Sequence, residues 1–230
     1  MPAIKKNLEK INGLIADAAL SCGRKPEDIL LIAVTKKKNI ETVMEAIRSG
    51  AKHFGENYIQ EAVDKIDIIG KEKACWHFIG HLQSNKAGIA VKYFEYIHTV
   101  DSFKLAKEID RQAKAIHKIQ KILLQVNISN EKTKSGTDAE MAMELIRQIN
   151  GFENIALQGL MCIPPYFEDP EDARSFFRAL LQIREGIMAH HFSNVAMNHL
   201  SMGMSNDFRV AIEEGATMVR IGTSIFGERN

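Results

Sequence analysis

The sequence is poor in cysteine, in excess charge of either sign and in long apolar runs, and each shortage excludes a class of protein. Its 230 residues contain three cysteines, Cys22, Cys75 and Cys162, an odd number spread widely along the chain. This spacing excludes a disulfide framework, and without a CxxC motif or a paired Cys/His pattern it predicts no zinc site. We therefore expect a reducing, cytoplasmic environment and no bound metal.

Charge and hydropathy exclude two further classes of partner. Basic residues number 30 and acidic residues 29, and the net charge of +1 offers no electrostatic footprint for nucleic acid or a membrane surface. The amino terminus opens an amphipathic pattern instead of a signal region, and no apolar run approaches the roughly 20 residues that span a bilayer. We expect binding to neither nucleic acid nor membrane.

Short apolar runs alternate with helical patterns along the whole chain. An amphipathic helix is predicted over residues 3–22, where Ile4, Leu8, Ile11 and Ile15 recur at spacings of three and four. Strands are predicted at 29–35, 52–55, 76–79, 95–99, 121–128, 156–161, 194–199 and 216–221. Helical segments lie between them near 40–49, 57–68, 83–92, 102–117, 138–150, 171–190 and 206–214.

Eight predicted strands separated by helices favour parallel pairing, because every parallel return needs a crossover connection. The count predicts an α/β fold, a single (β/α)8 TIM-like barrel with an extra N-terminal helix, as one domain over residues 1–230. A doubly wound open sheet is the alternative that strand count leaves open. A similarity within the sequence supports repeated units: Ala46–Ala51 and Ala211–Ala216 each end a predicted helix with glycine before an apolar strand.

A lysine ends the first apolar strand. In the run Ile29–Lys36, alternate side chains face opposite sides of the sheet, and Lys36 shares the parity of Ile32 and Val34. If this even set faces the barrel interior, Lys36 reaches the mouth at the carboxyl ends of the strands, where barrel active sites form. An amine desolvated there can form a Schiff base. A solvated basic loop is the alternative interpretation.

The last predicted strand leads into a turn suited to a phosphate. The run Val219–Phe226 delivers Arg220 and then turns through Gly222 and Thr223 into backbone N–H groups, which point their positive ends at an anion. Ser201 follows the preceding strand, and phosphate sites in such barrels often lie in the loops after strands seven and eight. A lysine and a phosphate cradle in one fold predict an aldehyde-bearing, phosphorylated cofactor.

Other polar residues at strand ends have structural interpretations beside functional ones. Asn57 and His81 follow the second and third strands and are candidates to line the mouth, whereas Trp76 and His77 suit packing equally well. Ser205 is expected to cap the helix that follows it.

Five stretches together resemble the YggS/PROSC family of pyridoxal-phosphate-binding proteins, also called PLP homeostasis proteins. They are Ala33–Lys36, His53–Tyr58, His77–Lys86, Leu200–Asp207 and Val219–Gly227, and the resemblance runs along essentially the whole chain. Two positions depart from the family pattern: Thr35 stands where serine is more usual, and Asn39 where proline is common.

The resemblance implies a barrel like that of alanine racemase and the cofactor pyridoxal 5′-phosphate (PLP). The residues that it implies for cofactor binding are Lys36, Asn57, Ser201, Arg220, Gly222 and Thr223. In this set Lys36 forms the covalent Schiff base and Arg220 faces the pyridine nitrogen. Ser201, Gly222 and Thr223 hold the phosphate, and Asn57 is a neighbour of the ring.

Arg220 and the length of the chain both bear on catalysis. Pyridoxal enzymes that need a strong electron sink place a carboxylate at the ring nitrogen, whereas a guanidinium leaves that nitrogen largely unprotonated. Racemases of this barrel type tolerate such an arginine but add a second domain with a tyrosine base, and this chain stops at Asn230. We therefore expect two-base racemisation to be absent.

The expected function is that of a noncatalytic carrier or regulator in intracellular vitamin B6 homeostasis. We expect it to act as a monomer and to pass PLP to apo forms of PLP-dependent enzymes. A PLP-dependent amino-acid racemase or decarboxylase that uses Lys36 as its base is the main alternative. A cofactor-free Schiff-base aldolase on a barrel is a third.

Overall fold

The chain folds into a closed barrel of parallel strands. The structure, a computed structural model, describes residues 3–129, 131, 135–190, 192 and 194–228. Within these residues eight strands form a ring, because β4 pairs with β5 as well as with β3. They are β1 (Leu30–Val34), β2 (His53–Glu56), β3 (Cys75–Phe78), β4 (Tyr96–Val100), β5 (Gln120–Asn127), β7 (Ile155–Met161), β8 (Val195–Ser201) and β9 (Met218–Ile221). The predicted barrel is confirmed, and the open-sheet alternative is excluded.

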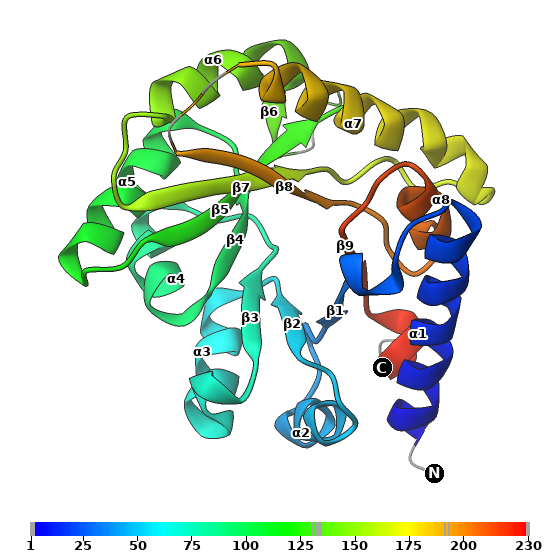
Figure 1. Cartoon of the computed structure of the whole chain (residues 1–230). Coiled ribbons are helices and arrows are strands. Elements are labelled where there is room, and N and C mark those ends of the chain that lie inside the picture. Colours follow the sequence, from blue (N-terminus) through cyan, green and yellow to red (C-terminus); the bar gives the residue numbers. More distant parts are fainter. Residues whose placement is uncertain (1–2, 130, 132–134, 191, 193, 229–230) are drawn as a thin grey trace.

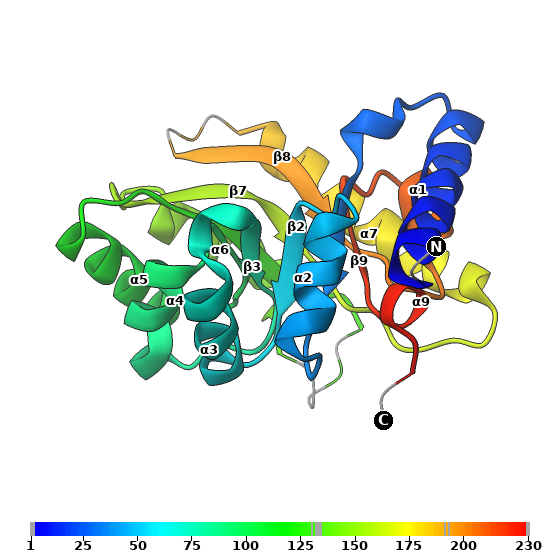
Figure 2. The ribbon, with the colours of Figure 1, turned by 90° about the horizontal axis from the view of Figure 1, so that it is seen from below.

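Helices surround the strands (Figure 1). They are α1 (Ala3–Ser21), α2 (Ile40–Arg48), α3 (Ile59–Ile69), α4 (Ala87–Tyr93), α5 (Phe103–Ala115), α6 (Ala139–Ile149), α7 (Arg174–Met188), α8 (Phe208–Glu213) and α9 (Thr223–Phe226). The N-terminal helix α1 lies beside α8 and α9 in both views (Figures 1 and 2) and packs against them. It therefore covers the part of the barrel where the chain's last elements lie.

Among the strands and α-helices of the described residues, two short elements were not predicted. The strand β6 (Thr137–Asp138) pairs with the last two residues of β5, and α9 is a single turn directly after β9. Both are too short to produce a hydrophobic period that a sequence pattern can detect.

The prediction that Ser205 caps a helix is wrong. The helix α8 begins at Phe208, and Asp207 occupies the N-cap position. The Asp207 carboxylate instead accepts the backbone N–H of Met204 at 2.6 Å, which closes the loop between β8 and α8. Asn39, one of the two departures from the family pattern, caps α2 by accepting the N–H of Thr42 at 2.9 Å.

The repeated glycines end their helices as the sequence predicts. Gly50 and Gly215 have φ angles of 96° and 97°, in the left-handed region. In each case the following alanine N–H returns to the carbonyl oxygen five residues earlier, at 3.0 Å for Ala51 and 2.8 Å for Ala216. This hydrogen bond closes a Schellman motif that turns the chain from helix to strand.

The strands have an outer and an inner face with different packing. Most of the buried apolar side chains, including Ala33 and Phe54, form the large core between strands and helices. Inside the barrel a smaller cluster joins Ile32, Leu123 and Met218 with Met161. The even-numbered side chains of β1 therefore face inward, which is the condition under which the sequence places Lys36 at the mouth.

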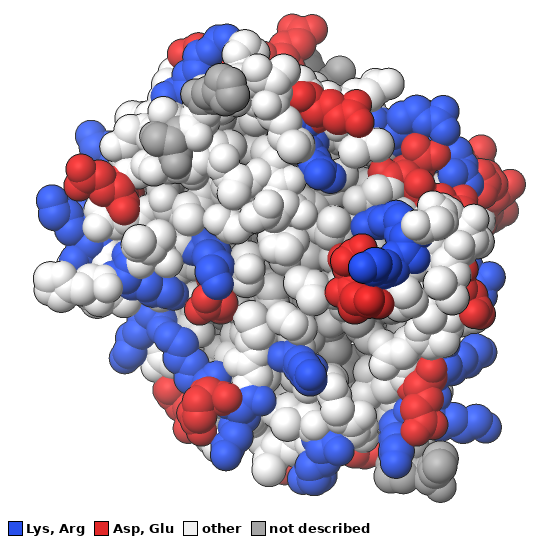
Figure 3. Space-filling model, viewed as in Figure 1, with Lys and Arg blue, Asp and Glu red and all other residues white. Residues whose placement is uncertain are grey.

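The surface carries charges of both signs. In Figure 3 the basic and acidic side chains are interspersed over the face that is shown. No helix in the described part of the chain combines the length and the apolar character needed to cross a membrane.

Candidate functional site

The pairing of β1 with β9 brings the two ends of the candidate site together. In this register Ile32 lies opposite Arg220. A Cβ atom added at Gly222 would lie 3.3 Å from the carbonyl oxygen of Val34, so the two strands remain in close contact beyond their paired residues. Lys36 follows Val34 by two residues. It therefore shares the carboxyl rim with the turn at Gly222, although the two lie near opposite ends of the sequence.

Lys36 is half-buried and lies in a turn that buried polar groups hold in place. Thr35, the residue before it, is fully buried, and its hydroxyl donates to Glu56 Oε1 at 2.7 Å. The Lys65 ammonium donates to the carbonyl oxygen of Thr35 at 2.7 Å and to Glu56 Oε1 at 2.8 Å. A third bond of 2.6 Å joins Lys65 to Glu61. The backbone that carries Lys36 is therefore fixed by an ion-paired network.

Sequence reasoning did not identify Lys65, although a signal was present. Lys65 is buried on the face of α3 that also buries Ala62, Ile66 and Ile69. A lysine on the apolar face of an amphipathic helix has to find acidic or carbonyl partners, because an unpaired buried ammonium is strongly destabilising. Glu56, inside an apolar strand, is the matching signal.

Arg220 is buried beneath the rim. Its side chain is 4% exposed, and its Nη1 and Nη2 groups donate to Ser201 Oγ at 2.7 Å and to the carbonyl oxygen of Cys162 at 2.9 Å. The described residues give this guanidinium no ion pair, and burial lowers its pKa from the ordinary value. Asp207 is a nearby carboxylate that partly offsets this effect. Among the described residues this buried cation therefore donates its hydrogen bonds to neutral groups, Ser201 and the carbonyl of Cys162.

A chain of hydrogen bonds, which we term the histidine relay, runs from Arg220 through the barrel interior. Ser201 Oγ lies 3.0 Å from His98 Nδ1, His98 Nε2 lies 2.9 Å from His77 Nδ1, and His77 Nε2 lies 3.0 Å from His53 Nδ1. Burial lowers the pKa of His77 and His98 well below the ordinary value. Both rings are therefore neutral at pH 7, and each carries one ring proton.

The predicted phosphate turn is a short helix start. Gly222 occupies the N-cap of α9 and its carbonyl oxygen accepts the N–H groups of Ile225 and Phe226. The N–H groups of Thr223 and Ser224 belong to the first turn, where a helix has no carbonyl of its own to accept them. Both residues are exposed. This part of the rim can therefore receive an anion from solvent.

Asn57 lies in a pocket of about 190 Å³ at the carboxyl ends of β2 to β5. The pocket is lined by Asn57, Gly80, His81, Thr99 and Gln125, among others. The amide oxygen of Asn57 is buried and has no hydrogen-bond partner in the described part of the chain. A Cβ atom at Gly80 would lie 2.1 Å from the backbone oxygen of Asn57, so only glycine lets these two loops approach.

Comparison with known proteins identifies the relatives of this chain. The family model of the alanine racemase N-terminal domain matches residues 3–230. The pyridoxal phosphate homeostasis protein of Vibrio alginolyticus is 40% identical over 234 residues, covering 100% of this chain and 99% of that protein. Its counterpart from Aquifex aeolicus is 41% identical over 224 residues and covers 97% of each.

Solved structures are also similar to this chain. PipY of Synechococcus elongatus with PLP bound is 33% identical, with a TM-score of 0.79 over 93% of this chain and 100% of that chain. An alanine racemase of Clostridium difficile has a TM-score of 0.76 over 100% of this chain and 57% of that chain. At 15% identity, this second likeness concerns the fold alone.

Proposed function

This chain belongs to the family of pyridoxal phosphate homeostasis proteins and has the barrel of the alanine racemase N-terminal domain, and from this we propose that it binds PLP as a noncatalytic carrier or regulator. One observation carries the proposal: half-buried Lys36 follows β1 by two residues, and Arg220, a buried cation without an ion pair among the described residues, lies on the adjacent strand β9. PLP supplies an aldehyde, a phosphate and a pyridine nitrogen when bound.

The aldehyde, the phosphate and the pyridine nitrogen of PLP each have a complementary group at or just beneath the rim. The amine of Lys36 would hold the aldehyde as a Schiff base. The backbone N–H groups at Gly222 and Thr223 would receive the phosphate, since the start of a helix favours an anion. Arg220 retains N–H groups beyond the two that it donates to protein, and these would reach the pyridine nitrogen. Asn57 offers a buried amide oxygen with unused hydrogen-bonding capacity at the same mouth.

Ser201 fits a different role from the phosphate contact that the family resemblance implies. Its side chain is completely buried, and its hydroxyl lies between Arg220 Nη1 and His98 Nδ1. We assign Ser201 to the orientation of Arg220, and the phosphate to the turn after β9.

Arg220 supports the noncatalytic part of the proposal. A guanidinium donates a hydrogen bond to the ring nitrogen without protonating it, so the ring is a weaker electron sink than one that faces a carboxylate. The barrel then retains a reactive aldehyde reversibly and promotes little carbanion chemistry. Passing the cofactor to apo PLP-dependent enzymes is the use that such reversible retention best supports.

The lysine assignment is tested by titrating the purified protein with PLP and recording its absorbance. We expect a Schiff-base band that Lys36→Ala abolishes. Lys37→Asn is the matched control, because it removes a neighbouring charge and asparagine tolerates the φ of 60° found there. Borohydride reduction followed by peptide mass mapping should place the modification on Lys36. An unchanged band in Lys36→Ala would remove that residue from the proposal.

The carrier role needs a second experiment. The loaded protein is mixed with apo forms of PLP-dependent enzymes while the Schiff-base band is followed. Loss of the band matched by a gain of recipient activity supports delivery, whereas a retained band supports storage or sensing. Turnover of a panel of amino acids at rates on the order of 1–1000 per second would instead establish the racemase or decarboxylase alternative.

A further inference from the structure

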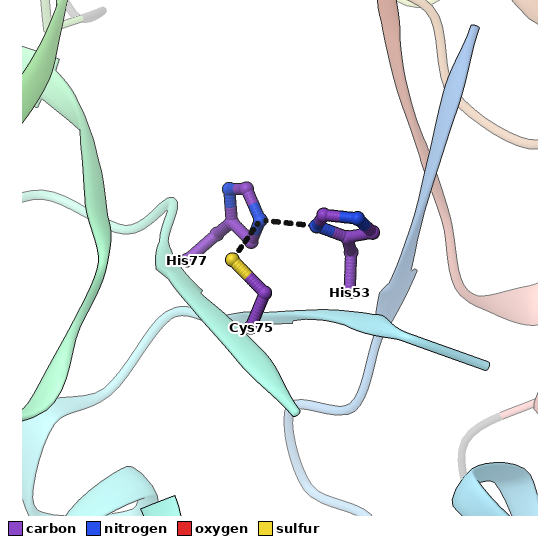
Figure 4. A group of neighbouring side chains, drawn as sticks. All are labelled: His53, Cys75 and His77. Carbon is purple, nitrogen blue, oxygen red and sulfur yellow. Dashed lines mark hydrogen bonds between the residues drawn. The ribbon is translucent and has the colours of Figure 1, made fainter. Parts of the chain in front are cut away.

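Three potential metal ligands meet at the end of the barrel opposite to Lys36. His53 begins β2 and Cys75 begins β3, and the parallel register sets these two residues side by side. His77, two residues further along β3, points to the same side as Cys75. Figure 4 shows that His77 Nε2 faces both the sulfur of Cys75 and the ring of His53.

The distances between the three donor atoms suit one small cation. His77 Nε2 lies 3.0 Å from His53 Nδ1 and 3.4 Å from Cys75 Sγ, and all three atoms lie within 4.8 Å of one another. Tetrahedral Zn²⁺, with nitrogen at about 2.0–2.1 Å and sulfur at about 2.3 Å, separates two nitrogens by about 3.3 Å and nitrogen from sulfur by about 3.6 Å. The two distances from His77 Nε2 are within a few tenths of an ångström of these values, and a bound ion would require His53 Nδ1 and Cys75 Sγ to lie about 3.6 Å apart.

The chemistry of the donors points in the same direction. Two imidazoles and one thiolate form a donor set of the kind that Zn²⁺ takes, whereas Mg²⁺ and Ca²⁺ require oxygen ligands. The other ring nitrogen of His77 has a partner that orients the ring: His77 Nδ1 lies 2.9 Å from His98 Nε2. When a metal occupies Nε2, the proton of His77 sits on Nδ1 and is donated to His98. Metal-binding histidines are commonly oriented by such a second partner.

The cluster is open to solvent on one side. A pocket of about 420 Å³ is lined by His53, Cys75, Glu95, Tyr96 and Lys121, among others. Lys71 and Lys121 line this pocket and bring positive charge that opposes a metal; Lys121 is ion-paired with Glu95 at 2.8 Å, and the Lys71 ammonium donates to the carbonyl oxygen of Lys92. Lys52 is a further nearby positive charge. The pocket provides both access for an ion and room for a water molecule as a fourth ligand.

We propose that His53, Cys75 and His77 bind a Zn²⁺ ion at the amino-terminal end of the barrel, with water completing the coordination. No metal site is predicted from the sequence, because these ligands come from two adjacent strands and show no ligand spacing along one segment. The site shares no residue with the PLP site and does not depend on the proposed function. Burial raises the pKa of the Cys75 thiol to about 11, so metal binding has to displace its proton.

The test is a titration of the full-length protein with its cofactor retained, first with Co²⁺ and then with Zn²⁺. Difference spectra against metal-free protein should show one equivalent of Co²⁺ with a near-ultraviolet thiolate-to-metal band and tetrahedral visible bands. Zn²⁺ should displace it. Cys75→Ser should abolish the near-ultraviolet band and weaken Zn²⁺ binding by more than about 100-fold, since even outer-shell changes cost about 10–100-fold.

Matched variants separate this site from adventitious binding. Cys22→Ser removes an exposed thiol and should leave the spectrum and the stoichiometry unchanged. His53→Gln retains the thiolate and should weaken Zn²⁺ binding by more than about 10-fold, so the test survives if Cys75→Ser fails to fold. Lys36→Ala should bind Zn²⁺ as the wild type does. Wild-type affinity in folded Cys75→Ser or His53→Gln, or a Co²⁺ spectrum without the thiolate band, overturns the proposal.

Discussion

The ammonium group of Lys65 lies 2.7 Å from the main-chain carbonyl oxygen of Thr35, the residue immediately before Lys36. Lys65 also binds Glu61, and that carboxylate accepts the backbone N–H of Lys37. Two anchors therefore flank Lys36, one on each side along the chain. If Lys36 holds an aldehyde as we propose, its side chain has to remain at a fixed place on the rim, and these two anchors, which we term the Lys65 clamp, supply that constraint.

Removing the clamp should be strongly destabilising. In Lys65→Met the Glu56 carboxylate remains fully buried without its cation, and breaking a buried pair in this way costs about 3–5 kcal/mol. We expect a loss of this size in the free energy of unfolding, measured by urea denaturation, together with weaker PLP binding. Lys73→Met is the control, because that side chain is 61% exposed.

A second change should identify the cause of that loss. Adding Glu56→Gln to Lys65→Met removes the uncompensated charge and should restore part of the stability. If the double variant is no more stable than Lys65→Met alone, the burial of the Glu56 charge is not the source of the loss.

The same carboxylate predicts a dependence of stability on pH. Burial raises the pKa of Glu56 above its ordinary value, and the Lys65 ammonium only partly offsets this effect. One carboxylate oxygen takes both hydrogen bonds, and the other has no partner among the described residues, so it can carry a proton. Between the ordinary and the raised pKa the folded chain binds more protons than the unfolded chain. Stability contributed by Glu56 is therefore present below this window and is lost as the pH rises through it.

The measurement compares wild type with Glu56→Gln by urea denaturation from about pH 4 to about pH 7. The free energy of unfolding of the wild type, relative to the variant, should fall across this range. A difference that increases with pH would show a depressed pKa, as in an ordinary ion-paired carboxylate. Glu72→Gln, at a side chain 74% exposed, should show no comparable trend.

Much of the fold follows from the sequence because each barrel strand is a short apolar run between helical patterns. The runs at 29–35 and 156–161 match β1 and β7 within one residue at each end. Closure of the ring was predicted from the number of strands, although the pairing of β4 with β5 is a long-range contact that no local pattern contains. The pairing of β4 with β5, which closes the ring, is evident only from the three-dimensional structure.

In the candidate site, too, local motifs could be predicted from the sequence, whereas contacts between strands could not. Lys36, Arg220 and Gly222 belong to local motifs, and the sequence indicates their chemistry. The histidine relay and the Lys65 clamp depend instead on the strand to which each residue is adjacent. His77 was equally consistent with packing, because in a parallel barrel both faces of a strand are buried and periodicity does not distinguish inside from outside.

The relay makes a prediction about proton positions. One hydrogen bond joins His77 Nδ1 to His98 Nε2, and it contains one proton. If His98 carries its proton on Nδ1, its Nε2 accepts, and His77 must then carry its proton on Nδ1 as well. The opposite choice places both protons on Nε2. Two neutral rings joined in this way therefore adopt the same tautomer.

Nitrogen-15 NMR of histidine-labelled protein measures this directly. We expect His77 and His98 to share one tautomer at pH 7, and saturating Zn²⁺ to place both protons on Nδ1. Exposed His190 is the internal control and should not respond to the metal. Opposite tautomers in the two rings, or a positively charged ring, would contradict the relay as described.

The end of β1 and the turn after β9 lie very close together. A Cβ atom at Gly222 would lie 3.3 Å from the carbonyl oxygen of Val34, tighter than ordinary van der Waals contact, and 3.4 Å from the Cβ atom of Val34. Because the neighbour is backbone, Gly222→Ala has to displace the end of β1 or of β9, and overpacking of this kind costs about 1–3 kcal/mol. The part of the rim that would move carries both Lys36 and the turn at Gly222 and Thr223. We expect PLP to bind about 10-fold more weakly, which corresponds to about 1.4 kcal/mol.

Gly151→Ala is the matched control, because its added Cβ would meet nothing within 4 Å. Spectroscopic titration with PLP gives the affinity of both variants, and urea denaturation gives their stability. Wild-type PLP affinity in Gly222→Ala would show that the cofactor does not depend on the spacing between β1 and β9. A loss of stability in both variants with no loss of affinity would show the same. A loss of affinity confined to Gly222→Ala would instead locate the cofactor against this pair of strands, because the added methyl group changes no charge and removes no hydrogen bond.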